Sequence, residues 1–268
     1  MRLLSVCAVC LSLLLFPGVS GAESGDSPLE ARWRQECRAA RAVTGFALLD
    51  ARGQEAGLHA DSPFPLLSVF KLHVAMHVLE KLSREGGSLT QPVHIPAEEL
   101  LPDTYSPMRD AHKGQSVTLP LREVLRYMIA ESDNNACDIL IARFGGLEQV
   151  PATARALGGE PLELRKTEAG MHDNIYNQYA NWSTPRAVVR LLRGFFEAPH
   201  IGEAYKACLA DCMRATTTGS GRLAAGLPPE ARLGHKTGSS DRSPGGLLFA
   251  SNDVGFFQLP DGRRVYMA

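Results

Sequence analysis

The sequence has no run rich in lysine or arginine, and its 28 basic and 29 acidic residues nearly cancel. Nucleic-acid-binding surfaces need clustered basic residues, so nucleic acid is not an expected partner. Beyond the N-terminal segment, no apolar run approaches the roughly 18 residues that cross a bilayer. Internal repeats are also absent. With 268 residues, 44% of them hydrophobic, the chain is expected to be globular, with one large or two small domains.

Cysteine is scarce, and no CxxC pair occurs anywhere beyond the N-terminal segment. The four cysteines of that part are Cys37, Cys137, Cys208 and Cys212. This spacing supports neither a zinc ribbon nor a thioredoxin-like redox site, and no metal or cofactor is expected. Cys208 and Cys212 fall on one face of an expected helix, where packing is their simplest role. Their disulfide state stays open.

The first 22 residues have the pattern of a secretory signal peptide. Arg2 supplies the positive charge, residues 3–16 form the apolar core, and 20–22 are a small-residue cleavage site. We therefore expect cleavage after Ala22 and a periplasmic or secreted protein with no further membrane attachment. The alternative, an uncleaved membrane anchor, is disfavoured by the short core.

Apolar periodicity and turn residues indicate strands near both ends and helices between them. The expected strands are 44–50, 55–60, 232–239, 246–258 and 264–268. The expected helices are 28–42, 68–82, 121–130, 135–144, 185–196 and 202–214, with 86–117 and 160–181 mostly loop. The simplest arrangement is an α+β fold. In it, 23–61 and 215–268 form one antiparallel sheet lobe, and 62–214 is an inserted all-α lobe.

Ser68-Val69-Phe70-Lys71 places a hydroxyl and an amine one turn apart at the start of an expected helix. A nucleophilic serine needs a nearby base, and the free N–H groups of a helix start can stabilise an oxyanion. A partly buried lysine can have its pKa lowered enough to accept a proton. The alternative for this string alone is a capping serine beside a solvated lysine.

Two further strings follow in order along the chain. Ser132-Asp133-Asn134 lies at the break between two expected helices, although Asp133 is also a typical helix cap. Lys236-Thr237-Gly238 lies on an expected strand, where a cation and a hydroxyl suit a carboxylate ligand. Each string alone is a weak signal, but all three in this order in an exported chain are improbable by chance.

With these strings, the chain resembles the class A serine β-lactamases, for which they are a known motif set. The resemblance covers about 30–268. Further matches are Thr104-Tyr105-Ser106-Pro107, Glu168 and Arg222, and the strings 132–137, 168–172 and 179–182 resemble the extended-spectrum PER-type subgroup. The resemblance implies a β-lactamase/transpeptidase-like fold: a five-stranded antiparallel sheet flanked by helices, plus an all-α lobe with an omega loop at about 160–181. We expect a monomer, although the sequence leaves the oligomeric state open.

The resemblance implies a role for each site residue. Ser68 attacks the lactam carbonyl, and the backbone N–H groups of Ser68 and Ser239 form the oxyanion hole. Lys71 and Ser132 relay a proton to the lactam nitrogen, and Glu168 activates the water that hydrolyses the acyl-enzyme. The substrate-binding set is Tyr105, Asn134, His172, Arg222, Lys236, Thr237, Gly238 and Ser239. Either Lys71 or Glu168 is the base for acylation.

The chain departs from the common family pattern in two places. Ala169 stands where proline usually follows the glutamate, so a cis X-Pro bond is impossible there and the loop must follow another path. His172 replaces an asparagine, and it either binds a water or is a surface residue. The last expected strand reaches Ala268, so the family's terminal helix is expected to be missing.

The resemblance favours hydrolysis of penicillins and cephalosporins through a serine acyl-enzyme, which confers antibiotic resistance. The sequence does not rank these two substrate groups. One alternative is a penicillin-binding D,D-peptidase acting on peptidoglycan stem peptides. Another is a catalytically inactive binding protein or truncated inactive fragment.

Overall fold

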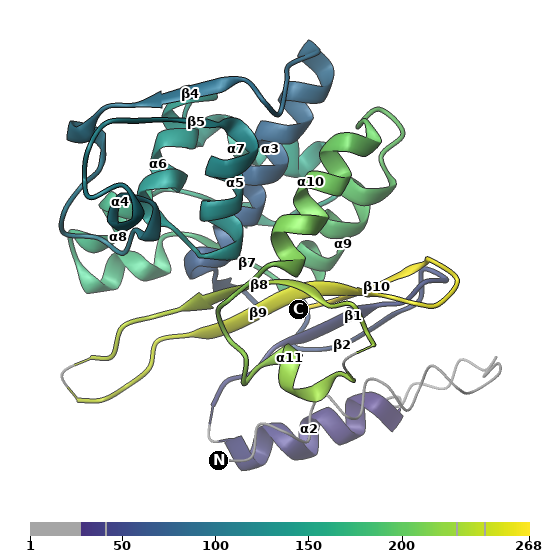
Figure 1. Ribbon diagram of the computed structural model, residues 1–268. Helices are drawn as coiled ribbons and strands as arrows, with labels where there is room; N and C mark the ends of the chain where they lie inside the picture. Colours follow the sequence, from purple (N-terminus) through teal and green to yellow (C-terminus); the bar gives the residue numbers. More distant parts are fainter. Residues whose placement is uncertain (1–27, 41, 229, 244) are drawn as a thin grey trace.

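The computed structural model describes residues 28–40, 42–228, 230–243 and 245–268, so the expected signal peptide lies outside the described residues. The fold is built on a five-stranded antiparallel sheet with helices on both faces (Figure 1). Its strand order is β2-β1-β10-β9-β8. The strands are β1 (Phe46–Leu49), β2 (Glu55–Leu58), β8 (Gly234–Ser239), β9 (Ser251–Gln258) and β10 (Arg264–Met267).

The two ends of the chain meet inside this sheet, as expected. Leu49 of β1 pairs with Tyr266 of β10, which also pairs with Phe256 of β9. Side chains alternate between the faces of a strand, so Tyr266 joins the core beneath the helices while Val265 and Met267 face the opposite side. The α+β prediction is confirmed, although all five strands of this sheet are shorter than expected.

Helices cover both faces of the sheet (Figure 1). α9 (Pro185–Glu197) and α10 (Glu203–Arg214) lie on the face toward the helical region. α2 (Pro28–Ala40) covers the other face, where Leu29 and Trp33 share a core with Val265 and Met267. Short α11 (Leu223–Gly226) lies on the connection that enters β8.

The helical region surrounds α3 (Phe70–Glu85), whose residues are buried on nearly every side. A helix that is buried all round must be packed on by several others, and this helix also carries Lys71. Its C-cap, Gly86, adopts a left-handed conformation that ends the helix. α3 is packed by α5 (Leu121–Ala130), α6 (Asn134–Arg143), α7 (Val150–Ala156) and α10, and α4 (Pro107–Ala111) packs on α5 and α6.

Two segments expected to be mostly loop contain regular structure. Residues 86–117 include α4, β4 (Pro92–Ile95) and the start of the strand β5 (Val117–Pro120), which pairs with β4. Residues 160–181 include β6 (Leu162–Glu163), α8 (Glu168–His172) and the 3-10 helix η4 (Ile175–Tyr179). β6 joins β3 (Phe64–Pro65) and β7 (Trp182–Ser183) in a small sheet. Such short elements depend on tertiary partners and leave little periodicity in the sequence.

The remaining 3-10 helices are η1 (Leu67–Val69), η2 (Ala97–Glu99) and η3 (Leu147–Gln149). None of the helices in the described ranges is long and apolar enough to pass through a membrane. All strands of the large sheet lie outside residues 62–214. The division into a sheet lobe, 23–61 and 215–268, and an all-α lobe, 62–214, stays a prediction.

Candidate active site

Ser68 lies in η1, directly before α3, where the chain turns sharply. The expectation that Ser68 starts the α-helix is wrong by two residues, because α3 begins at Phe70 with Val69 as its N-cap. Leu67 has a φ of 48°, in the left-handed region that side chains rarely adopt. Ser68 makes no capping hydrogen bond, so its hydroxyl is free for other partners.

Lys71 lies one turn beyond Ser68 and is completely buried, so the alternative of a solvated lysine is wrong. Its Nζ donates to Ser68 Oγ and to Asn134 Oδ1, at 2.8 Å each, and forms an ion pair with Glu168 Oε1. A buried ammonium is tolerated only with such a set of acceptors. Three elements, α3, α6 and α8, therefore converge on this one amine.

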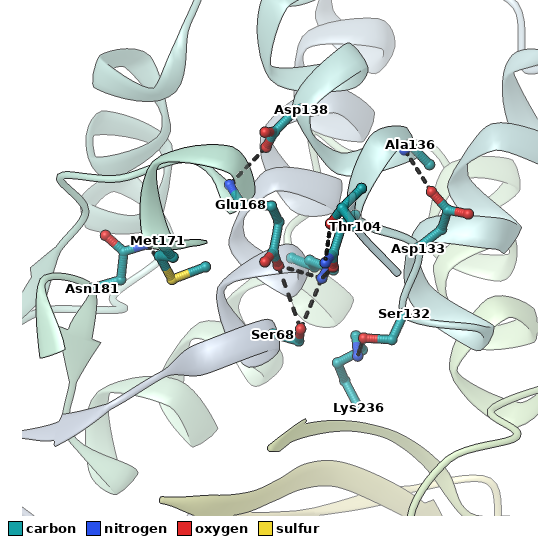
Figure 2. A network of polar contacts seen from close by, with 12 residues as sticks. Ser68, Thr104, Ser132, Asp133, Ala136, Asp138, Glu168, Met171, Asn181 and Lys236 are labelled. Atoms are coloured by element: carbon teal, nitrogen blue, oxygen red, sulfur yellow. Dashed lines mark hydrogen bonds and ion pairs between the residues drawn. The ribbon is translucent and has the colours of Figure 1, made fainter. Parts of the chain in front are cut away.

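Glu168 is 4% exposed and begins α8, with Ser68 Oγ 3.4 Å from its Oε1 (Figure 2). The carboxylate of Asp138 on α6 accepts the backbone N–H groups of Glu168 and Ala169, at 2.8 and 2.9 Å. Thr167 caps the same turn through the N–H of Gly170. In the described chain the cis peptide bond is Glu160–Pro161, and the one after Glu168 is not cis. Sequence reasoning missed Asp138.

A second buried polar residue, Asn181, closes the neck of the loop that carries Glu168 (Figure 2). Its Oδ1 accepts the N–H groups of Arg165 and Lys166, and its Nδ2 donates to the Lys166 carbonyl at 2.7 Å. The Asn181 carbonyl also accepts the N–H of Leu66, two residues before Ser68. Asn181 therefore joins the two ends of the loop through its side chain, and its backbone carbonyl holds the turn that leads to Ser68.

Ser132, Asp133 and Asn134 form the turn between α5 and α6, as expected. Ser132 adopts a φ of 62°, a strained conformation that often marks functional sites. Asp133 caps α6 through the N–H of Ala136 at 2.8 Å and also binds the N–H of Met108, so it has a structural role. Asn134 donates to Thr104 Oγ1 at 2.9 Å while it accepts from Lys71.

Lys236 on β8 is fully buried, and its Nζ donates to Ser132 Oγ at 2.8 Å (Figure 2). Burial and the nearby charge of Lys71 lower the pKa of this amine well below its ordinary value, although Glu168 and Asp253 oppose the shift. One lysine comes from α3 and the other from β8 of the large sheet. Between them, the Ser68 and Ser132 hydroxyls each accept a hydrogen bond from an amine.

Gly238 explains how β8 comes so close to the nucleophile. A Cβ at this position would lie 2.6 Å from the carbonyl oxygen of Leu66, so only glycine permits this approach. Beyond it, Ser239 Oγ accepts from Arg222 Nη2 at 2.6 Å, and Thr237 Oγ1 shares a 2.6 Å hydrogen bond with Thr218. Thr218 was not predicted, although it lies in the same string as Arg222.

These groups border a cavity of about 410 Å³, a size that suits a small organic ligand. Its lining includes Leu67, Ser68, Tyr105, Ser132, Asn134, Glu168, Met171, His172, Ile175, Gln178, Thr218, Thr237, Ser239 and Asp241. The two lysines and Arg222 lie behind this lining. Tyr105 is 57% exposed at the rim, and the exposed His172 lies 3.4 Å from Asn134 Nδ2 through its Nε2.

No group of three or more His, Cys, Asp or Glu side chains in the described ranges is arranged to hold a metal ion. The four described cysteines are free thiols. His77 hydrogen-bonds Thr153 and the Phe144 carbonyl, which gives its ring a structural role.

The sequence and the fold of this chain match those of known proteins. A model of the Beta-lactamase enzyme family matches residues 29–268. The chain belongs to this family. A β-lactamase of Bacteroides uniformis is 42% identical over 243 residues, which are 90% of this chain and 82% of the relative.

A solved class A β-lactamase from Bacteroides cellulosilyticus superimposes with a TM-score of 0.83 and 40% identity, covering 89% of this chain and 87% of the other. The extended-spectrum β-lactamase PER-1 of Pseudomonas aeruginosa is 35% identical, covering 76% of this chain and 66% of PER-1. The resemblance to class A enzymes is therefore confirmed, and the PER type is among the relatives.

Proposed function

We propose that this enzyme hydrolyses penicillins and cephalosporins through an acyl-enzyme on Ser68 and thereby confers resistance to them. The observation that carries the proposal is the position of Ser68 Oγ. It accepts a hydrogen bond from Lys71 Nζ at 2.8 Å and lies 3.4 Å from Glu168 Oε1. A serine is activated when a base lies within reach of its proton. Here Ser68 Oγ donates to Glu168, and Lys71 can take the proton once it has passed one of its own to Glu168.

Acylation joins Ser68 Oγ to the lactam carbonyl carbon and breaks the bond from that carbon to the lactam nitrogen. The Ser68 proton passes to Lys71 or Glu168, Lys71 passes a proton on to Ser132, and Ser132 gives its own proton to the lactam nitrogen. Lys236 lowers the cost of that transfer because its ammonium hydrogen-bonds Ser132 Oγ. The backbone N–H groups of Ser68 and Ser239 hold the carbonyl oxygen as it becomes negative.

The substrate carboxylate binds at the β8 end of the cleft. Thr237 and Ser239 line the cavity there, and Lys236 and Arg222 supply positive charge from behind them. Arg222 also donates to the carbonyls of Gly238 and Asn252, so its guanidinium has a fixed position. The fixed guanidinium orients Ser239 Oγ for the anion.

Deacylation requires Glu168 to remove a proton from the attacking water. Its main chain is fixed by Asp138 and its side chain by Lys71, so the carboxylate points at the Ser68 ester. His172 and Asn134 lie beside the expected path of the water and of the substrate's side-chain amide. This buried carboxylate favours a β-lactamase over a D,D-peptidase, which shares the nucleophile but has no such base.

The protein is further proposed to act as a monomer in the periplasm or after secretion, following cleavage after Ala22. N-terminal sequencing of the exported protein tests the cleavage site, and light scattering of the purified protein tests its oligomeric state.

The proposed hydrolysis is tested with a chromogenic cephalosporin while intact protein mass is recorded, with Ser68→Ala as the control. Many turnovers per molecule, lost in the control, are the expected result. A single lasting adduct without turnover would indicate the peptidase-like alternative. The absence of both colour and adduct would indicate an inactive protein.

A further inference from the structure

A buried histidine and a buried carboxylate lie beside the charges that are proposed to bind the substrate carboxylate. His235 is the residue before Lys236 on β8, and Asp253 lies on the neighbouring strand β9. Their side chains are only 7% and 6% exposed. His235 Nδ1 lies 2.9 Å from Asp253 Oδ1 and 3.0 Å from Asp253 Oδ2. An ionised carboxylate only accepts hydrogen bonds, so the ring nitrogen is the donor of this pair.

Asp253 also holds the turn that carries Arg222. Its Oδ2 accepts the backbone N–H of Leu223, the residue after Arg222, at 3.0 Å. Arg222 Nη1 in turn donates to the carbonyl of Asn252, the residue before Asp253, at 2.6 Å. The acid and the arginine are therefore joined through their neighbours in the chain, and a negative charge lies beside the arginine.

Arg222 nevertheless forms no ion pair with a carboxylate in the described part of the chain. Its guanidinium donates to two backbone carbonyls and to Ser239 Oγ. Lys236 is bound in the same way, since its Nζ donates to Ser132 Oγ and to the Thr237 carbonyl. Such neutral acceptors fix a cation without cancelling its charge. Both cations therefore keep a positive charge that a substrate carboxylate can use.

The charge of Asp253 acts on both cations from behind the cavity. Burial lowers the pKa of Arg222, and the negative charge of Asp253 opposes that shift. At Lys236, Asp253 likewise opposes the lowering of the pKa by burial and by Lys71. Asp253 itself lies outside the lining of the cavity of about 410 Å³. The acid is therefore placed to compete with a substrate for these cations and not to touch the substrate.

The hydrogen bond from His235 determines which partner this carboxylate has. A buried carboxylate must keep hydrogen-bond donors around it. His235 Nδ1 lies within hydrogen-bond distance of both oxygens, so the carboxylate is satisfied without the guanidinium. Without this donor, the Leu223 N–H would be left to satisfy a buried charge. The carboxylate would then turn toward Arg222, because the guanidinium offers several donors beside it.

We propose that His235 is a positioning residue that holds Asp253 away from Arg222 and so keeps the charge of Arg222 available to the substrate carboxylate. This inference rests on the proposed function, in which the carboxylate binds at Thr237 and Ser239. The pair acts on the capture of an anionic substrate and not on the chemistry at Ser68. Its loss therefore changes KM and leaves kcat nearly unchanged.

The test compares benzylpenicillin with its methyl ester, which lacks the carboxylate charge, in the wild type and in His235→Phe. Phenylalanine keeps a ring in this place but cannot donate to Asp253. We expect KM for benzylpenicillin to rise about tenfold at a nearly unchanged kcat, because a charge-assisted contact to the carboxylate is lost. The kcat/KM for the ester stays at the wild-type value, since the ester does not need the charge of Arg222.

Three further variants show whether the hydrogen bond and the charge of Asp253 cause the effect. His235→Asn keeps a donor for Asp253, and we expect it to retain the wild-type ratio of acid to ester. Asp253→Asn combined with His235→Phe removes the competing charge, and we expect it to recover most of the loss. His94→Phe is the matched control, since exposed His94 also joins two strands through Nδ1, which lies 3.1 Å from Thr118 Oγ1. It is expected to change neither substrate's kinetics.

An equal loss for the acid and the ester in His235→Phe would overturn the proposal, because it would mean that His235 only supports the sheet. So would an unchanged ratio of acid to ester, or a loss that the added Asp253→Asn does not relieve. If His235→Phe fails to fold, as judged by its unfolding transition, His235→Leu takes its place in the same comparison. Failure of the proposed hydrolysis is a separate result, because the wild type would then turn over neither substrate.

Discussion

The catalytic cluster around Lys71 and the aromatic contacts of Phe249 with Tyr176 and Tyr179 are held in different ways. Around Lys71, buried charges and hydroxyls are joined by short hydrogen bonds that come from α3, α6 and α8. At Phe249, two exposed tyrosines, Tyr176 and Tyr179, meet a half-buried ring edge-on, and Asp241 donates to Gln178 beside them over 3.3 Å. We expect the first region to resist opening, because breaking one contact there strands a buried charge, and the second to open at a lower cost in free energy.

This difference separates chemistry from selectivity. Changes in the cluster are expected to affect every substrate, since all share the same ester and the same carboxylate. Changes at the rim are expected to affect substrates according to their side chains. Loops supported by a fixed framework often carry specificity for this reason.

The largest effect on the catalytic cluster is expected from Ser68→Ala. We expect no acylation at all, because no other hydroxyl occupies the position between Lys71 and Glu168. Intact-mass measurement after exposure to benzylpenicillin checks this, with Ser83→Ala, at a half-buried serine that contacts His200 and Gly202, as the control. A covalent adduct on the Ser68→Ala protein would reject Ser68 as the nucleophile.

Glu168→Gln separates the two halves of the reaction. We expect deacylation to slow by about 10²- to 10⁴-fold, so that the acyl-enzyme accumulates, because the amide cannot accept the proton of the water. Time-resolved mass spectrometry measures the adduct. Glu160→Gln, which removes a surface carboxylate paired with Arg155, serves as the control. Unchanged turnover would show that Glu168 is not the base.

His73 is a buried polar group on α3 that lacks the partners of the catalytic cluster. Among the described residues neither ring nitrogen makes a well-formed hydrogen bond, and burial lowers the pKa of His73 from 6.5 to about 4, with the Val69 and Phe70 carbonyls opposing part of the shift. Between these values the unfolded chain binds a proton that the folded chain does not. The free energy of unfolding therefore falls by about 3 kcal/mol as the pH drops from about 6.5 to about 4.

His73→Leu should remove that pH-dependent loss. Urea unfolding at pH 7 and pH 4 measures it for the wild type, for His73→Leu and for a control at the exposed His200. Equal pH dependence in all three proteins would contradict the assignment of the effect to His73.

Lys236→Ala breaks the cluster on the β8 side. We expect kcat/KM to fall by about 10- to 100-fold, mainly through KM, because a buried charge that faces the carboxylate is lost. Steady-state kinetics with benzylpenicillin measures this, and Lys113→Ala on the surface is the control. A loss confined to kcat would instead assign Lys236 to the proton relay through Ser132.

The smallest effect is expected at the rim. Tyr105→Ala removes a side chain that is 57% exposed, and we expect kcat/KM to change by about twofold to threefold for benzylpenicillin. The same kinetic assay measures this change in kcat/KM, with Lys236→Ala assayed in parallel. A loss as large as that of Lys236→Ala would show that the rim is as important for binding as the buried cluster.

Several features of the site could be predicted from the sequence because they depend on local patterns. The motif around Ser132 lies at a helix break, and Asp133 caps the helix that follows, since capping is a property of neighbouring residues. The pairing of the two chain ends followed from their period-two patterns. Asp138 and Asn181 left no such signal, because both bind backbone groups of distant residues.

The sequence by itself determined which chemical groups are present and which segments are helices and strands, because those depend on residue type and on spacing along the chain. Only the tertiary structure decided that Ser68 lies in a 3-10 turn, that Lys71 is buried against Glu168, and that Phe249 meets the tyrosines of the omega loop. The physical reason is that these contacts join residues about 100 or about 70 positions apart. Their distances are set by how α3, α6 and the sheet pack together.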